Sequence, residues 1–169
     1  MTTTAAATTV LVFAAAFGIV RAPSVPVPVW IDTDPAIGEP ERDVDDGLAL
    51  VQAFRSPELD IRGVSVVFGN ATLDRGLPIA RRLVRDFGPP RLQVFRGAAK
   101  ESERSIETEA SRAMAAALRA APLTILALGP VTNVATVLAL HPDLAPRVTD
   151  RPSGASRARR TRGRRRRAS

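Results

Sequence analysis

The sequence between residues 27 and 140 alternates four times between a short apolar run and a longer segment with helical spacing. Parallel strands need a helix-sized crossover, and right-handed crossovers place the helices on both faces of the sheet. The pattern therefore predicts an α/β fold: a Rossmann-like open parallel sheet built from four βα units. The expected strands are 27–32, 61–68, 92–95 and 123–128, and the expected helices are 45–54, 72–87, about 105–120 and 129–140.

Two of these segments carry further information on burial. The run 123–128 is continuously apolar, which is typical of a strand buried on both faces. The segment 72–87 has one apolar side and one arginine-rich side, as expected for a helix that packs on a sheet. Its apolar side comprises Leu73, Leu77, Ala80, Leu83, Val84 and Phe87, and its basic side comprises Arg75, Arg81, Arg82 and Arg85.

The charge distribution divides the chain into three parts. The net charge is +7, but residues 151–169 contain nine arginines and no acid, which leaves residues 1–150 at −2. The tail has neither apolar periodicity nor an aromatic residue for base stacking, so we expect it to be disordered and expect no specific nucleic-acid partner. Residues 26–150 are the expected domain, and residues 1–25 are an apolar and proline-rich extension.

The extension bears on localisation. Residues 5–20 are uncharged, which is short for a membrane span, and no Lys or Arg precedes them as in a signal peptide. We expect a cytoplasmic protein without a stable membrane span, with secretion left open. A homo-oligomer is also left open.

Five aspartates follow the first apolar run within fifteen residues: Asp32, Asp34, Asp43, Asp45 and Asp46. Carboxylates crowded at one strand end repel one another unless a cation or a proton neutralises them. The chain has no cysteine, so a metal would be held by oxygen atoms or by the single histidine, His141. A hard metal ion is the simplest expectation.

Polar residues and tight turns follow three of the expected strands. Asp32 and Asp34 follow the first, Asn70 follows the second, and Leu128-Gly129-Pro130 follow the fourth. In open parallel sheets, ligands bind beyond the carboxyl ends of the strands. We therefore expect these residues, distant in sequence, to be neighbours around one site.

Four segments, in the same order, resemble the inosine-uridine preferring nucleoside hydrolases. They are DTDP with the later DDGLAL, GVSVVFGNATLDR, VFRGA, and ILALGPVTNVATVLALHPDLAPRV. The resemblance covers about residues 28–148. It implies calcium-dependent hydrolysis of the N-glycosidic bond of a ribonucleoside, with calcium as cofactor and a small nucleoside as substrate.

The resemblance also implies roles for individual residues. Asp34 matches a calcium ligand that serves as general base, and Asp46 matches a second, bidentate calcium carboxylate. Leu128 stands where the family offers a backbone carbonyl to calcium. Asp45 and Asn70 match residues that contact ribose.

Asp32 is the first residue of the same DTDP motif, and we expect it to be a structural partner of the residues that contact calcium and substrate. One calcium ion, with its six to eight oxygen ligands, could hold ribose and position the nucleophile together.

The chain departs from the family pattern in two respects. Nine residues, AIGEPERDV, separate Pro35 from Asp45, where the family has two, so we interpret seven of them as an insertion that adds Asp43. The family also continues beyond the position of Val148 with a further half that supplies more ligands. The domain is thus expected to be truncated relative to the family, with impaired hydrolase activity.

Two alternatives from other classes remain open. The first is a magnesium-dependent phosphatase of the DxD type, with Asp32 as nucleophile. The second is a non-catalytic product, either a calcium or ribose binder or a basic nucleic-acid binder that uses residues 151–169.

Overall fold

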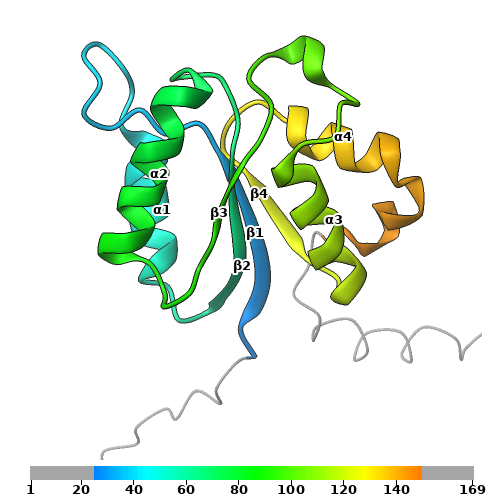
Figure 1. The fold of residues 1–169 in the computed structure, drawn as a ribbon. Helices are drawn as coiled ribbons and strands as arrows, with labels where there is room; N and C mark the ends of the chain where they lie inside the picture. The colour runs from blue at the N-terminus through cyan, green and yellow to red at the C-terminus, as the bar shows by residue number, and fades with distance from the viewer. Residues whose placement is uncertain (1–24, 150–169) are drawn as a thin grey trace, which may run out of the picture.

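The computed structural model describes residues 25–149, which form one four-stranded parallel sheet with the strand order β3-β2-β1-β4 (Figure 1). The expected fold class and its four βα units are confirmed. The strands are β1 (Val27–Thr33), β2 (Leu59–Val66), β3 (Val94–Arg96) and β4 (Thr124–Ala127). The helices are α1 (Asp45–Phe54), α2 (Leu73–Phe87), α3 (Glu109–Ala120) and α4 (Thr132–Leu140), with short 3₁₀ segments at η1 (Glu101–Glu103) and η2 (Pro142–Arg147).

The predictions for the N-terminal apolar stretch and the arginine-rich tail fall on residues 1–24 and 150–169, which lie outside the described residues. Within the described part, no helix has the length and apolar character needed to cross a bilayer.

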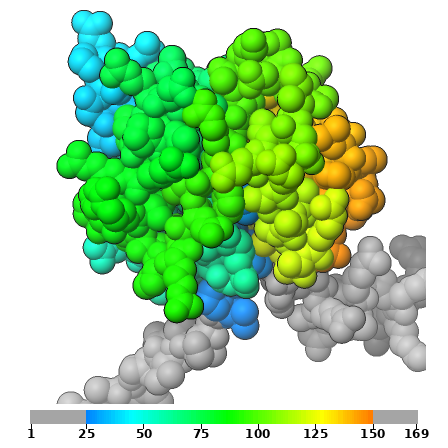
Figure 2. Space-filling model, viewed as in Figure 1, coloured from blue at the N-terminus to red at the C-terminus, as the bar shows by residue number. Residues whose placement is uncertain are grey.

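The helices form two layers, α1 and α2 on one face of the sheet and α3 and α4 on the other (Figure 1). Successive residues of β1 point to opposite faces. Trp30 packs with Met114 and Leu118 beneath α3, whereas Ile31 packs with Leu50 and the apolar side of α2. Each such buried side chain contributes roughly 1.5–3 kcal/mol. In the space-filling view, the two helical layers cover most of the sheet (Figure 2).

The strand order places a topological switch point at β1. The chain moves outward from β1 through β2 to β3, and then crosses back to add β4 on the other side of β1. The connections that leave β1 and β4 therefore run to opposite faces, and a crevice is expected at their carboxyl ends. Asp32 lies at this point, paired in register with Ser65 of β2 and Ala127 of β4.

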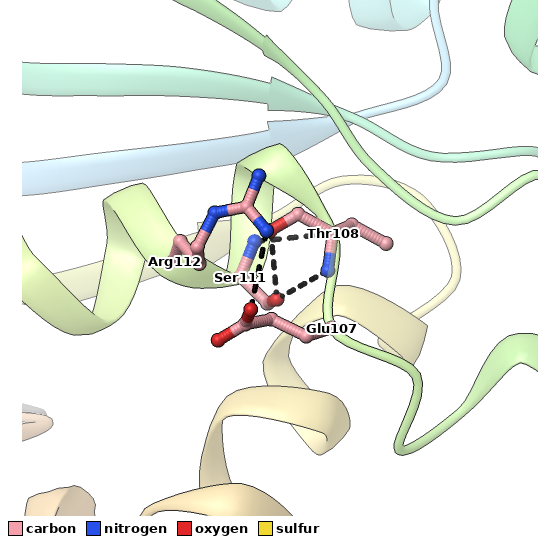
Figure 3. A network of polar contacts seen from close by, with 4 residues as sticks. All are labelled: Glu107, Thr108, Ser111 and Arg112. Carbon is pink, nitrogen blue, oxygen red and sulfur yellow. Dashed lines mark hydrogen bonds and ion pairs between the residues drawn. The ribbon is translucent and has the colours of Figure 1, made fainter.

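Helix α3 begins at a reciprocal cap (Figure 3). Thr108 Oγ1 accepts the Ser111 N–H at 3.1 Å, and Ser111 Oγ accepts the Thr108 N–H at 2.8 Å. Arg112 adds an ion pair with Glu107 at 3.1 Å. Two backbone donors that the first helical turn cannot satisfy are thus bonded, which fixes where α3 starts.

Two burial predictions are wrong. β4 is only partly buried, because β1 is its single strand partner among the described residues, and only an isolated bridge from Leu123 to Val148 extends the sheet beyond it. Phe87 is 44% exposed, because it is the last residue of α2 and lies beyond the edge of the sheet core.

Candidate active site

Asp34 lies at the carboxyl end of β1, closely enclosed by two glycine turns. The Asn70 N–H donates to Asp34 Oδ2 at 2.6 Å, and the residue is only 6% exposed. A Cβ atom at Gly69 or at Gly129 would overlap the Asp34 carboxylate, and Gly69 also has a φ of +154°. The turns after β2 and β4 therefore close on Asp34, and the predicted convergence of three strand ends is confirmed.

Asp46, in the first turn of α1, lies against the same strand end. Its Oδ2 accepts a hydrogen bond from Thr33 Oγ1 at 2.6 Å and another from the Asp34 N–H at 3.0 Å. Asp46 is buried, whereas its neighbour Asp45 is exposed and accepts the Asp46 N–H with Oδ1 at 3.0 Å. The two buried carboxylates, Asp34 and Asp46, are thus held together by a backbone hydrogen bond.

Asn70 connects this strand end to the loop 36–44. Its side-chain Nδ2 donates to the Asp43 carbonyl oxygen at 2.8 Å, and the residue is half-buried. Asp43 therefore contacts the site through its backbone. On the opposite side, the Leu128 N–H donates to the Asp32 carbonyl oxygen at 2.8 Å, which holds the turn after β4 against β1.

Asp32 is fully buried behind the site. Its Oδ1 accepts hydrogen bonds from Ser65 Oγ at 2.5 Å and from Asn133 Nδ2 at 2.9 Å. Its Oδ2 is the one buried side-chain oxygen or nitrogen in residues 25–149 that has no hydrogen-bond partner. A nucleophile must be accessible to its substrate, so the phosphatase alternative is wrong in assigning that role to Asp32.

Ser65 and Asn133 were not predicted as site residues. Ser65 also accepts a hydrogen bond from Trp30 Nε1 at 2.8 Å, and Asn133 Oδ1 accepts the Ala98 N–H at 2.9 Å. Asn133 lies within the last of the four segments that resemble the family, and it is the second residue of α4. That position was the available signal, but an Asn near a helix start is equally typical of a cap.

The pKa values of the two aspartates at the end of β1, Asp32 and Asp34, are both raised. Burial raises the pKa of Asp32 to about 6, although its hydrogen bonds from Asn133 and Ser65 act in the opposite direction. Burial also raises the pKa of Asp34 to about 6; the neighbouring Asp46 adds to the rise and the Asn70 N–H opposes it. A carboxylate with a pKa near the working pH is suited to accept a proton from water.

The site presents oxygen atoms, which are the type of ligand that a hard cation binds. Two buried carboxylates lie side by side, the Leu128 turn adjoins them, and the partnerless Oδ2 of Asp32 lies in the same strand end. Across residues 25–149, however, no three Asp, Glu, His or Cys side chains are grouped as a complete metal site. A hard cation such as calcium prefers six to eight oxygen ligands, and these residues alone do not make up such a set.

A family model described as inosine-uridine preferring nucleoside hydrolase matches residues 29–150, the segment that contains the aspartate site and all of the sheet except the first two residues of β1. The chain belongs to this family. The matched residues include the strand ends that meet at Asp34.

Curated relatives include the pyrimidine-specific ribonucleoside hydrolase RihA of Klebsiella pneumoniae (strain 342), which is 31% identical over 145 residues. The match covers 70% of this chain and 44% of that protein. Probable uridine nucleosidase 1 of Oryza sativa subsp. japonica is 28% identical over 146 residues, with 70% and 43% covered.

Solved structures show the same fold. The plant nucleoside hydrolase PpNRh1 superposes with a TM-score of 0.63 at 26% identity, over 73% of this chain and 46% of that one. An inosine-guanosine nucleoside hydrolase superposes with a TM-score of 0.60 at 23% identity, over 73% and 46%. The chain therefore spans about half the length of the relatives that it matches.

Proposed function

We propose that the chain contributes to a calcium-dependent ribonucleoside hydrolase site, which converts a nucleoside and water into ribose and a free base. The observation that carries the proposal is the position of Asp34. It is a nearly buried carboxylate at the topological switch point, with a raised pKa, and it is enclosed by two turns and joined to Asp46. Family membership supports the reaction class.

The residues that would hold calcium are Asp34, Asp46 and the backbone carbonyl of Leu128. Thr33 Oγ1 and the Asp34 N–H both bond Oδ2 of Asp46, so Oδ1 is its freer oxygen. This favours single-oxygen coordination by Asp46 over the bidentate ligation that the resemblance implies. When bound, calcium supplies positive charge that favours ionised carboxylates and polarises the oxygen atoms around it.

Asp34 would act as the general base. Its Oδ2 already accepts the Asn70 N–H, so Oδ1 is the oxygen that would take a proton from the attacking water. Cleavage of a glycosidic bond passes through an oxocarbenium-like state, which adjacent carboxylates stabilise.

Asp45 and Asn70 would bind ribose hydroxyl groups, since Asp45 is exposed and Asn70 is fixed at the rim by Asp43. Asp32 would support the site from within the sheet.

We further propose that hydrolysis by this chain alone is weak. Among residues 25–149 no three Asp, Glu, His or Cys side chains are grouped so that they could hold a metal ion, whereas calcium needs six to eight oxygens. This favours, as the second candidate, a calcium or ribose binder without turnover. The relatives bear names that specify pyrimidine, uridine and inosine-guanosine nucleosides, so both base classes belong in the test.

The test is a ribose-release assay on purine and pyrimidine nucleosides, with calcium or with EDTA. We expect any release to require calcium, to disappear in Asp34→Asn, and to persist in Asp60→Asn, which removes an exposed partner of Arg62. Release that survives EDTA or Asp34→Asn would refute the proposal. Inactivity with calcium-dependent stabilisation that Asp34→Asn removes would establish the binder.

A further inference from the structure

A cavity of about 190 Å³ lies between the loop 36–44 and the first turn of α2. Its lining is polar and cationic: Glu39, Arg42, Ala71, Thr72 and Arg75. The loop projects beyond the helical layer of α1 and α2 (Figures 1 and 2). Glu39 and Arg42 both belong to the AIGEPERDV segment, most of which we interpret as an insertion relative to the family pattern. On that interpretation, the inserted loop forms one wall of the cavity.

The charge of the cavity favours an anion. Two guanidinium groups from separate segments, those of Arg42 and Arg75, line the cavity together with one carboxylate, that of Glu39. The closest Arg75–Glu39 approach is 3.4 Å, which is long beside the 2.7–2.9 Å (roughly) of a strong charge-assisted hydrogen bond. Arg75 thus keeps donor capacity for another oxygen. Guanidinium forks match the oxygen geometry of phosphate better than any other side chain does.

The cavity adjoins the proposed ribose contact. Ala71 and Thr72 directly follow Asn70, and Arg42 directly precedes Asp43, whose carbonyl oxygen accepts the Asn70 side chain. Two residues of extended chain span at most about 7 Å, so both walls of the cavity begin within that reach of the Asn70–Asp43 hydrogen bond. A group bound in the cavity would lie next to a sugar held by Asn70.

We propose that this cavity binds the phosphate of a phosphorylated ribosyl compound, so that the site accepts ribose carrying a phosphate group, as in a nucleoside monophosphate. The sugar part of this proposal rests on the proposed function, and the phosphate part rests on the cavity alone. The same lining would accept inorganic phosphate, and adjacency to Asn70 is what favours a sugar phosphate.

The experiment measures binding of ribose 5-phosphate, ribose and inorganic phosphate to the full chain with calcium, by calorimetry or ligand-observed NMR. The cavity variant is Arg42→Gln/Arg75→Gln. The matched control is Arg62→Gln/Arg81→Gln, which removes the same charge from two exposed arginines outside the cavity. We expect ribose 5-phosphate to bind about tenfold or more tightly than ribose, a difference of about 1.4 kcal/mol. The cavity variant should lose that advantage, and the control should keep it.

The outcomes separate the two proposals. Equal binding of ribose and ribose 5-phosphate, or equal losses in both double variants, would overturn the phosphate site and leave the proposed function untouched. Inorganic phosphate that binds as tightly as the sugar phosphate would overturn the assignment to a sugar phosphate. Phosphate compounds that bind through Arg42 and Arg75, with no binding of ribose itself, would support the cavity and count against the proposed function.

Discussion

Asn133 donates its side-chain amide to Oδ1 of Asp32 over 2.9 Å, across 101 residues of sequence. The same amide accepts the Ala98 N–H with its oxygen, also at 2.9 Å, and Asn133 is fully buried. One side chain at the start of α4 thus ties the end of β1 to the loop after β3. Because Asp34 lies two residues beyond Asp32, this contact sets the position of the candidate site.

Replacing Asn133 with alanine should destabilise the fold by about 1–3 kcal/mol, because it leaves the buried Ala98 N–H without a partner and leaves Oδ1 of Asp32 with only the hydrogen bond from Ser65. Urea unfolding with a fitted midpoint and slope measures the change. Gln52→Ala, which removes an amide from the exposed side of α1, is the control and should alter stability by less than about 0.5 kcal/mol. Equal stability of the two variants would contradict the role given to Asn133.

The fold was largely predictable because local patterns and global topology agree. Apolar runs alternating with helical periodicity specified the parallel sheet, and α1 begins and ends at the predicted residues. The start of α3 was less well predicted, about four residues early. Ser105 has a φ of +75°, which ends any helical geometry there, and the cap at Thr108 sets the start. Such backbone details are not encoded in hydrophobic periodicity.

Apart from residues assigned through the family resemblance, such as Asp46 in α1, the candidate site was predictable only where residues follow strands. Asp34 and Asn70 could be placed together because parallel strand ends meet at one edge of the sheet. Asn133 and Ser65 could not, because their role consists of contacts with a partner far away in sequence. The cavity beside Arg42 was also missed, since it depends on how the loop 36–44 folds against α2.

The stability of the metal-free chain should fall as pH rises from about 4 to above 6. The pKa of Asp32 is about 6 in the folded state and near 3.8 when unfolded, so the folded state binds more protons between these values. Ionising the buried carboxylate at higher pH therefore costs stability, by about 3 kcal/mol over the whole window. Asp34 contributes in the same direction.

The comparison with Asp32→Asn isolates this effect, because asparagine stays neutral at every pH. Urea unfolding in EDTA at several pH values measures the free energy of unfolding of both proteins. As pH rises, this free energy should increase in the variant relative to the original chain, with most of the change between pH 4 and 6. Parallel curves for the two proteins would show that Asp32 has the same pKa in the folded and unfolded states, so that burial does not raise it.

The cap of α3 should contribute to the stability of the fold but not to calcium binding. Thr108→Ala removes the acceptor of the Ser111 N–H and should cost about 1 kcal/mol. Thermal unfolding measures the loss, and the shift in melting temperature on adding calcium should be the same as in the original chain. A smaller calcium response in this variant would mean that α3 contributes to the cation site.

Calcium should raise the melting temperature through Asp34 and Asp46. A ligand that binds only the folded state at 100 times its Kd adds about 2.7 kcal/mol, which is several degrees for a domain of this size. Asp34→Asn and Asp46→Asn should each abolish the shift. Asp43→Asn should keep it, because Asp43 is exposed and contacts the site through its backbone. Loss of the shift in Asp43→Asn would move the ligand assignment to the loop.

Gly129→Ala should disable the site through a single methyl group. A Cβ at this position would lie 2.5 Å from Oδ1 of Asp34, the oxygen proposed to take a proton, so the carboxylate or the turn must move. We expect the calcium-induced shift in melting temperature to be lost, with a destabilisation of about 1–3 kcal/mol from overpacking.

Gly38→Ala is the control. Gly38 has a φ of +91° with no atom within 4 Å of its added Cβ, so this change strains the backbone without touching Asp34. It should cost about 1 kcal/mol and leave the calcium response intact. Thermal unfolding of both variants with and without calcium decides the matter, and a normal calcium response in Gly129→Ala would show that cation binding does not need the close approach of this turn to Asp34.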